Sequence, residues 1–169
     1  MEYSEAKAEL ISFWGVIGTA WGINKTMSQI YAILLVSDRS LSIEEIMREL
    51  NISRGNASMN IRNLMGWGLA FKEVRPGERK EYFSGEKDLW AMARKVASER
   101  RKREIEPLLS KLEDLQDLDS LETAESEEFS KMVLELHELI GTFDKALQKF
   151  IGTNNKLAIK SFQKILSLT

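Results

Sequence analysis

The segment between Asn51 and Lys72 carries the side chains best suited to recognising another molecule. It contains asparagine and arginine at helical spacing but no acidic residue, although the whole chain holds 26 Asp and Glu residues. Asparagine can pair with the edge of adenine, and arginine with the edge of guanine. A basic segment without acids also favours contact with phosphate. These residue types predict binding to a nucleic acid; the alternative is an ordinary solvated helix.

A helix beginning after Ser53 would divide this segment into two faces. Ala57, Ile61 and Leu64 recur at the spacing of a buried face. The opposite face then presents polar side chains, and Gly55 would let a phosphate approach the backbone closely. The residues expected to contact DNA from this helix are Ser53, Arg54, Gly55, Asn56, Met59, Asn60, Arg62 and Asn63.

The periodicity changes from helical to alternating after this helix. Residues 69–74 and 81–83 each have the pattern of a short strand, and the Pro76-Gly77 pair between them is typical of a type II turn. A β-hairpin is therefore expected, with a tip that suits the negative potential of a DNA minor groove. A solvated turn is the alternative, because glutamates neighbour the basic residues. The basic side chains expected to contact DNA from this hairpin are Arg75, Arg79 and Lys80.

The elements before this segment must position it. Residues 4–22 carry apolar side chains at helical spacing. Thr26–Gln29 and Ser42–Glu45 each have the form of a capping box that starts a helix. Asn51-Ile52 predicts a tight turn, after which Ser53 is expected to cap the next helix. Three helices, with a tight turn between the second and third, and then a hairpin describe a winged helix-turn-helix, whose third helix enters the major groove.

The second half of the chain predicts long helices, because it holds few helix breakers. Helices are expected at about residues 86–104, around Pro107, from near Ser126 and over residues 155–168. The helix after Ser126 carries an apolar seam with alternating steps of four and three, which is typical of coiled-coil-like packing. This seam needs a partner, either in its own chain or in another subunit. Its members are Phe129, Val133, Leu136, Ile140, Phe143, Leu147 and Phe150.

The expected fold class is mostly α, a winged helix-turn-helix with a small β-hairpin wing and long terminal dimerisation helices. Residues 1–104 would form the DNA-binding domain, with its N-terminal helix and the start of a long helix. Residues 105–169 would form a helical dimerisation or regulatory region. The charge distribution agrees with this division, because residues 51–104 hold a net +6 and residues 105–140 a net −9. A basic middle beside an acidic segment suggests one surface for polyanions and another that is kept away from them; the alternative is accidental clustering of charges on solvated helices.

Composition argues against most enzyme classes. The chain has 169 residues, no cysteine and a single histidine, His137. Thiol nucleophiles, cysteine-ligated zinc sites and histidine-rich metal sites are therefore excluded. No nucleophile–base pair or phosphate-binding loop is recognisable. We expect no enzymatic activity, no cofactor and no metal site.

The sequence also predicts where the protein resides. The first residues are acidic and do not form a signal peptide. No apolar run reaches the roughly 18 residues that span a bilayer. A soluble, cytoplasmic protein without a membrane partner is expected.

Four segments together, residues 13–22, 52–56, 77–83 and 86–88, resemble the GbsR branch of the MarR-like transcriptional regulators. The resemblance covers about residues 9–104 and includes the order of helix, turn, wing and following helix. It implies a homodimeric, ligand-responsive repressor that binds a palindromic operator on double-stranded DNA, with dimerisation through the terminal helices. Family members named for glycine betaine synthesis respond to choline, so the implied effector is a quaternary amine.

Aromatic side chains could hold such an effector, because quaternary ammonium groups bind against aromatic rings. Trp14 and Trp21 lie seven residues apart on one helical face, so packing in the core is the alternative for these two. Trp67 and Trp90 would flank the exit of the DNA-reading helix and the start of the long helix. The residues considered for effector binding are therefore Trp14, Trp21, Trp67 and Trp90.

A different function is compatible with the same fold. A winged-helix domain can serve as a protein–protein interaction module without a DNA target. Charge reversal at Arg54, Arg62 and Arg79 would distinguish the two functions, because a module that binds protein would retain its activity.

Overall fold

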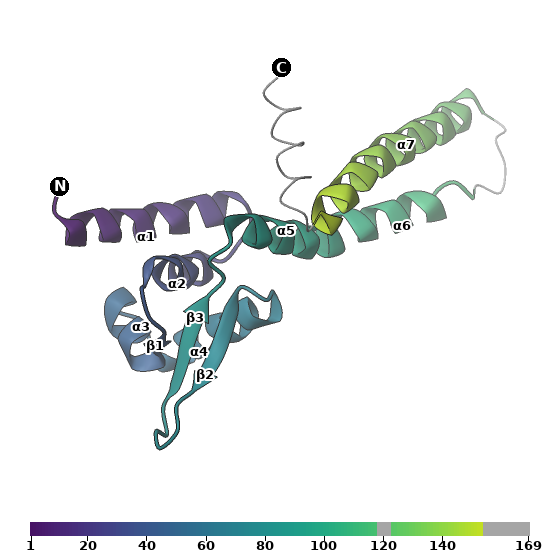
Figure 1. The fold of residues 1–169 in the computed structure, drawn as a ribbon. Coiled ribbons are helices and arrows are strands. Elements are labelled where there is room, and N and C mark those ends of the chain that lie inside the picture. The colour runs from purple at the N-terminus through teal and green to yellow at the C-terminus, as the bar shows by residue number, and fades with distance from the viewer. Residues whose placement is uncertain (118–122, 154–169) are drawn as a thin grey trace. The chain divides into compact units, whose positions relative to one another are not determined.

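The computed structural model describes residues 1–117 and 123–153. The chain is mostly helical with one small antiparallel sheet, and it divides into two compact units at Met92–Ala93 (Figure 1). This composition of elements confirms the predicted fold class. The helix expected over residues 155–168 lies outside the described residues.

The first unit is built around four helices. They are α1 (Tyr3–Ala20), α2 (Lys25–Val36), α3 (Ile43–Leu50) and α4 (Arg54–Gly66). The second helix is apolar on nearly all sides, so it can be covered by the other three at once. It contacts α1, α3 and α4, and its Ile30, Ile33 and Leu34 lie at the centre of the core.

The turn between α3 and α4 forms as the sequence predicts. The Ser42 hydroxyl and the Glu45 carboxylate make the reciprocal bonds of a capping box at the start of α3. Asn51 adopts a left-handed conformation with φ of 52°, which ends α3 sharply. The Ser53 hydroxyl then accepts a hydrogen bond from the Asn56 N–H and starts α4. These three local devices fix the direction in which α4 leaves the core.

The predicted start of α2 is wrong by two residues. Asn24, and not Thr26, caps the helix, since its side-chain oxygen accepts a hydrogen bond from the Met27 N–H at 3.0 Å. Asparagine is at least as good an N-cap as threonine, so Asn24 can start the helix two residues before the predicted cap.

The buried face of α1 also differs from the apolar pattern of its sequence. The residues that face α2 are Ile11, Gly15 and Gly18, and the two glycines allow the helices to approach closely. A Cβ added at Gly18 would lie 1.9 Å from the Ser28 hydroxyl oxygen. An apolar stripe of α1 and its C-cap is exposed on the first unit, formed by Leu10, Phe13, Val16 and Trp21.

The sheet of the first unit has three strands in the order β1-β3-β2. They are β1 (Leu41–Ser42), β2 (Ala70–Val74) and β3 (Glu81–Gly85), and both pairings are antiparallel. The two-residue β1 was not predicted, because it is too short to show an alternating pattern. It matters because it ties the segment before α3 to the hairpin.

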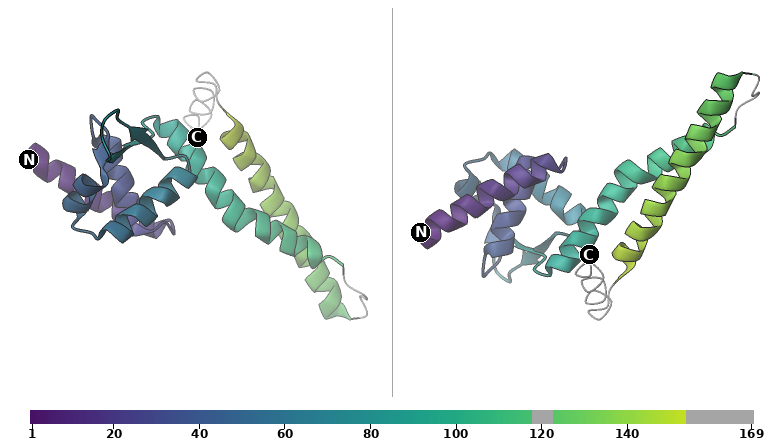
Figure 2. Two further views of the ribbon diagram at one scale, coloured as in Figure 1. Left: turned by 90° about the horizontal axis from the view of Figure 1, so that it is seen from below. Right: turned by 90° about the horizontal axis from the view of Figure 1, so that it is seen from above.

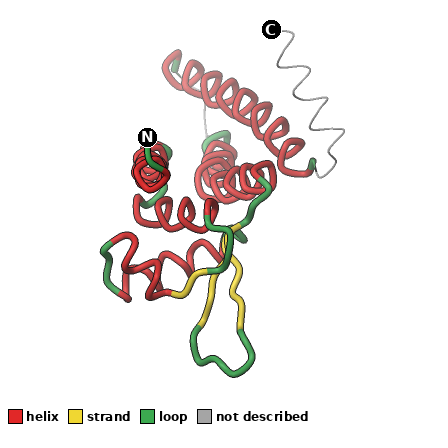
Figure 3. Tube along the Cα trace, turned by 60° about the vertical axis from the view of Figure 1, so that its left-hand side comes forward, coloured by secondary structure: helices red, strands yellow, loops and turns green. Residues whose placement is uncertain are grey.

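The hairpin of β2 and β3 projects from the helices and ends in a loop (Figure 3). Gly77 has φ of 81°, and the Glu78 N–H donates to the Arg75 carbonyl at 3.1 Å. This is the predicted type II turn, with Pro76 and Gly77 at its two central positions.

The chain after β3 is held against α2 before the next helix begins. The Lys87 ammonium donates to the carbonyl oxygens of Leu34, Leu35 and Ser37, at 2.7, 2.6 and 2.6 Å. It therefore satisfies backbone groups at the end of α2 that lack helical partners. The Asp88 carboxylate accepts from the N–H groups of two following residues and starts α5. The helix expected from residue 86 begins at Leu89 for this reason.

The second unit begins within α5 and contains the rest of a long irregular helix and its partner. The chain passes from α5 (Leu89–Arg100) through a π-helical turn at Arg101–Ile105 into α6 (Glu106–Asp114). Pro107 lies in the first turn of α6, where it needs no hydrogen-bond partner for its nitrogen. The partner is α7 (Ala124–Gly152), which runs back alongside α6 (Figure 2).

The predicted apolar seam of α7 is divided between two faces. Val133 is buried within the unit, whereas Phe129, Leu136 and Phe143 are exposed. Asp144 is buried because the Arg101 guanidinium donates two hydrogen bonds to its carboxylate, at 2.6 and 2.9 Å. This ion pair turns a partly polar face of α7 inward. The seam therefore contributes to packing within the chain and also leaves an exposed apolar stripe on α7.

Candidate nucleic-acid interface

The exposed side of α4 carries most of the residues expected to contact DNA. Ala57, Ile61 and Leu64 are buried, which confirms the predicted inner face. The polar and small residues on the other side are open to solvent, and a Cβ at Gly55 would meet no atom within 4 Å. The residues of this surface, called the α4 face below, are Ser53, Arg54, Gly55, Met59, Arg62 and Asn63.

Asn60 does not belong to the α4 face. Its side chain is only 1% exposed, and its amide nitrogen donates to the backbone and side-chain oxygens of Asn56, at 2.9 and 2.7 Å. Position 60 is three residues after Ala57 and one before Ile61, so it falls on the inner side of the helix. The expectation that Asn60 reads DNA is therefore corrected: it supports the helix and the half-buried Asn56 beside it.

The two arginines of α4 differ in their surroundings. Arg54 forms an ion pair with Glu44 of α3. Arg62 is exposed about two turns further along the same helix. In the part of the chain that the structure describes, its side chain makes no hydrogen bond or ion pair. A phosphate could approach Arg62 directly, whereas it would compete with a carboxylate at Arg54.

Glu44 is the residue that sequence analysis missed. The segment between Asn51 and Lys72 holds no acid, but the fold brings a carboxylate from the preceding helix against the start of α4. A hydrogen bond from its own backbone amide, the Arg54 guanidinium and the charge of Lys80 lower the pKa of Glu44, against the opposing effect of desolvation. Glu44 therefore stays ionised beside Arg54, a residue expected to contact DNA.

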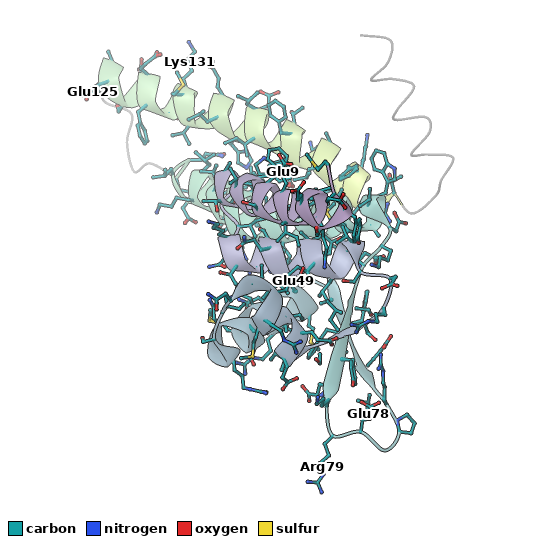
Figure 4. The ribbon with its side chains drawn as sticks, turned by 90° about the vertical axis from the view of Figure 1, so that its left-hand side faces the viewer. Glu9, Glu49, Glu78, Arg79, Glu125 and Lys131 are labelled. Carbon is teal, nitrogen blue, oxygen red and sulfur yellow. The ribbon has the colours of Figure 1, made fainter. Side chains whose placement is uncertain are left out.

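The wing carries its basic side chains in two different ways. Arg79 extends from the tip of the hairpin and away from the fold (Figure 4). Arg75 instead folds back onto the sheet, where its guanidinium lies 3.7 Å above the ring of Tyr82 and donates to the Ser40 hydroxyl at 3.1 Å. The expectation that Arg75 serves the tip is therefore corrected, since cation–π and hydrogen-bond contacts hold it at the base of the loop. Arg79 and Lys80 remain at the tip.

A surface cavity of 480 Å³ separates the second half of α4 from the hairpin. Arg62 lies at this cavity, and so does Lys72, which was not expected to take part in binding. The ammonium of Lys72 is 2.5 Å from the Glu81 carboxylate of the neighbouring strand. The cavity is therefore lined by charges of both signs and by the apolar Met65 and Phe83.

The four tryptophans considered for effector binding lie on separate elements. Trp14 is half-buried on α1, but Trp21 is 57% exposed at its end, so the alternative of core packing is wrong for Trp21. Trp67 follows α4 and Trp90 lies in the first turn of α5, and both are half-buried. Effector binding by these residues stays a prediction.

The fold has a counterpart among solved structures. The crystal structure of a transcriptional regulator is similar to this chain with a TM-score of 0.65 at 20% sequence identity, over 87% of this chain and 96% of that chain. No family model matches the chain, and no curated protein matches it. The likeness and the three-stranded sheet together show a mostly helical, winged-helix fold.

Across residues 1–117 and 123–153, no helix combines the length and the apolar character that crossing a bilayer requires.

Proposed function

We propose that this protein is a sequence-specific DNA-binding transcriptional regulator. The observation that carries the proposal is the α4 face, an exposed helical surface with two arginines and no acid of its own, beside a hairpin with a basic tip. An α-helix fits the major groove, and the wing tip would contact the adjacent minor groove or backbone. The likeness to a solved transcriptional regulator supports the proposal at the level of the fold.

The proposed regulator acts as a homodimer on a palindromic operator. Two-fold symmetric proteins place two recognition helices one DNA turn apart, which doubles the contacts that a single α4 can make. The exposed apolar stripes of α1 and α7 support dimerisation, because monomeric proteins rarely leave such continuous apolar surface in water. The terminal helices, including those after residue 104, would form the dimer.

The resemblance to the GbsR branch of the MarR-like regulators favours a repressor that responds to a small ligand. A quaternary amine such as choline is the effector to test first, and Trp14, Trp21, Trp67 and Trp90 are the aromatic residues available for it. The regulator would bind its effector and its operator in the cytoplasm.

The function is tested by selecting duplexes from a random DNA library with the purified protein, and by including DNA from upstream of its own gene. Fluorescence anisotropy then compares the selected duplex with a scrambled one. A specific regulator is expected to prefer the selected duplex by about 1,000-fold or more. The variant Arg62→Ala should lose affinity, whereas Arg48→Ala, which removes the same charge from the exposed surface of α3, should not.

The same assay can refute the proposal. If no duplex is preferred, and if charge reversal at Arg54, Arg62 and Arg79 leaves a cellular activity intact, the winged helix serves a protein partner instead of DNA.

A further inference from the structure

The start of α4 holds an ion pair that does not suit simple phosphate binding. Arg54 is the first residue of the helix, and its guanidinium is bonded to Glu44, which comes from the first turn of α3. Both side chains remain partly exposed to solvent. The acid therefore lies within the surface that would face DNA, and each phosphate that approaches Arg54 also approaches a negative charge.

A bonded arginine binds phosphate and guanine differently. Guanidinium has five N–H donors, and the contact with Glu44 uses only the Nη2 atom of Arg54. Enough donors remain for the paired contact with the O6 and N7 atoms of guanine. The carboxylate cancels most of the net charge of Arg54, however, and net charge is what binds phosphate in any sequence. The ion pair therefore weakens contact with DNA in general more than contact with one base.

The ion pair also restricts the conformation of Arg54. An unpaired arginine samples many rotamers, and ordering it in a complex costs conformational free energy. A side chain already held across the start of α4 would present its remaining donors in one direction. Arg62 provides the contrast within the same helix, since it keeps its charge and its freedom in the described structure.

We propose that Glu44 is a specificity-determining residue, which positions Arg54 for reading a base and reduces its attraction to phosphate. The inference rests on the proposed DNA-binding function and deepens it, because it divides the two arginines of α4 between roles. Arg54, held by its ion pair with Glu44, reads a base, whereas Arg62 binds the phosphate backbone of the DNA. Specific recognition often needs such a repulsive element against the wrong partner.

The test compares Glu44→Gln with the unchanged protein on the selected operator duplex and on a scrambled duplex. Glu49→Gln is the matched control, because it removes the same charge from the far end of α3, where Glu49 pairs with Lys7 of α1. Anisotropy titrations over about 50 to 200 mM salt give both affinities and the salt slope. Thermal unfolding of each variant shows that the fold is retained.

Freeing Arg54 should strengthen binding to the scrambled duplex about fivefold, and binding to the operator should stay equal or weaken. The ratio of the two affinities should then fall by at least about fivefold, and the logarithmic salt slope on scrambled DNA should steepen by about 0.9, the value for one more phosphate. Glu49→Gln should leave both quantities unchanged. In an Arg54→Ala background, Glu44→Gln should no longer alter the ratio.

Two results would overturn the inference. An unchanged ratio and salt slope in Glu44→Gln would show that the ion pair has no part in discrimination. An equal fall of the ratio in the Arg54→Ala background would show that Glu44 acts independently of Arg54. Both results require an unchanged protein that prefers its operator; a protein that prefers no duplex at any salt concentration would refute the proposed function itself, and the inference with it.

Discussion

α4 and α7 are both amphipathic helices that bury one side, yet they expose opposite chemistries. The α4 face presents arginine, asparagine and glycine, whereas α7 presents a stripe that includes Phe129, Leu136 and Phe143. A polar basic surface is stable in water when no polyanion is bound, whereas a continuous apolar stripe favours a stable interface with another protein surface. Under the proposed function, the first unit would bind DNA and the second unit would bind a protein partner.

The apolar stripe of α7 gives the prediction with the largest expected effect. Replacing Phe143, which is 67% exposed, by aspartate should separate the proposed dimer, because burying an unpaired charge in its interface is costly. Operator affinity should then fall about 1,000-fold through the loss of bivalent binding. Light scattering measures the oligomeric state, and anisotropy measures the affinity.

Leu134→Asp is the matched control for this change. Leu134 is also an exposed apolar residue of α7, but it lies on another side of the helix. It should remain dimeric and bind the operator normally. A dimer in both variants would show that the stripe of α7 is not the interface.

The second prediction concerns the ion pair that decides which side of α7 faces inward. Asp144→Ala should lower the free energy of unfolding by about 2 kcal/mol, because Arg101 loses its two hydrogen bonds to the buried carboxylate and keeps only its pair with Glu106. Glu104→Gln breaks the exposed pair with Arg100 and should cost only about 0.5 kcal/mol. Urea unfolding measures both values. Equal costs would mean that Arg101 and Asp144 do not determine how α7 packs.

The same two helices show what periodicity can and cannot predict. The spacing of Ala57, Ile61 and Leu64 identifies the inner side of α4 because one side of that helix is clearly apolar. The seam of α7 is apolar over a broader arc, so its spacing predicts a partner without deciding which residues face it. The buried Asp144 decides this, and its partner is 43 residues away in sequence.

The candidate site was predictable to a similar degree. The caps at Ser42 and Ser53 and the turn at Pro76-Gly77 depend on adjacent residues, so the sequence contains all the necessary information. Contacts between elements are different. The Glu44–Arg54 pair and the stacking of Arg75 on Tyr82 depend on how α3, α4 and the hairpin pack, which no local pattern records.

A third prediction separates folding from binding on the α4 face. Gly55→Ala should stabilise the isolated protein by up to about 1 kcal/mol, because alanine is a better helix former and the added Cβ meets no neighbour. The same Cβ should weaken operator binding about tenfold if the backbone of α4 lies against phosphate, since an overpacked contact costs on the order of 1 kcal/mol or more. Thermal unfolding and anisotropy measure the two effects.

Gly66→Ala serves as the control at the other end of α4, where a Cβ also meets open space. It should leave operator affinity unchanged. Normal binding by Gly55→Ala would place the DNA further from the start of α4 than the proposed interface requires.

The smallest expected effect is a pH dependence of the folding stability, which originates at the start of α3, the helix packed against α4. The Glu45 carboxylate bonds to the Arg39 guanidinium and to the Ser42 backbone and hydroxyl, and these contacts lower its pKa to about 2. A carboxyl with a depressed pKa binds its proton more readily in the unfolded chain, so folding gains stability above the ordinary pKa of about 4.5. This contribution should be complete at neutral pH and should disappear as the pH falls from about 4.5 towards 2.

Glu45→Gln isolates this charge, because glutamine can still complete a capping box. At pH 7 the variant should be less stable than the unchanged protein by about 1 kcal/mol, a typical value for a helix cap. Urea unfolding at a series of pH values should show the difference shrinking below about pH 4.5. A constant difference across the series would mean that Glu45 stabilises α3 by its shape and hydrogen bonds alone. The packing of α3 beneath α4 would then not depend on the charge of Glu45. Electrostatic interactions would matter only at the exposed surface of α4.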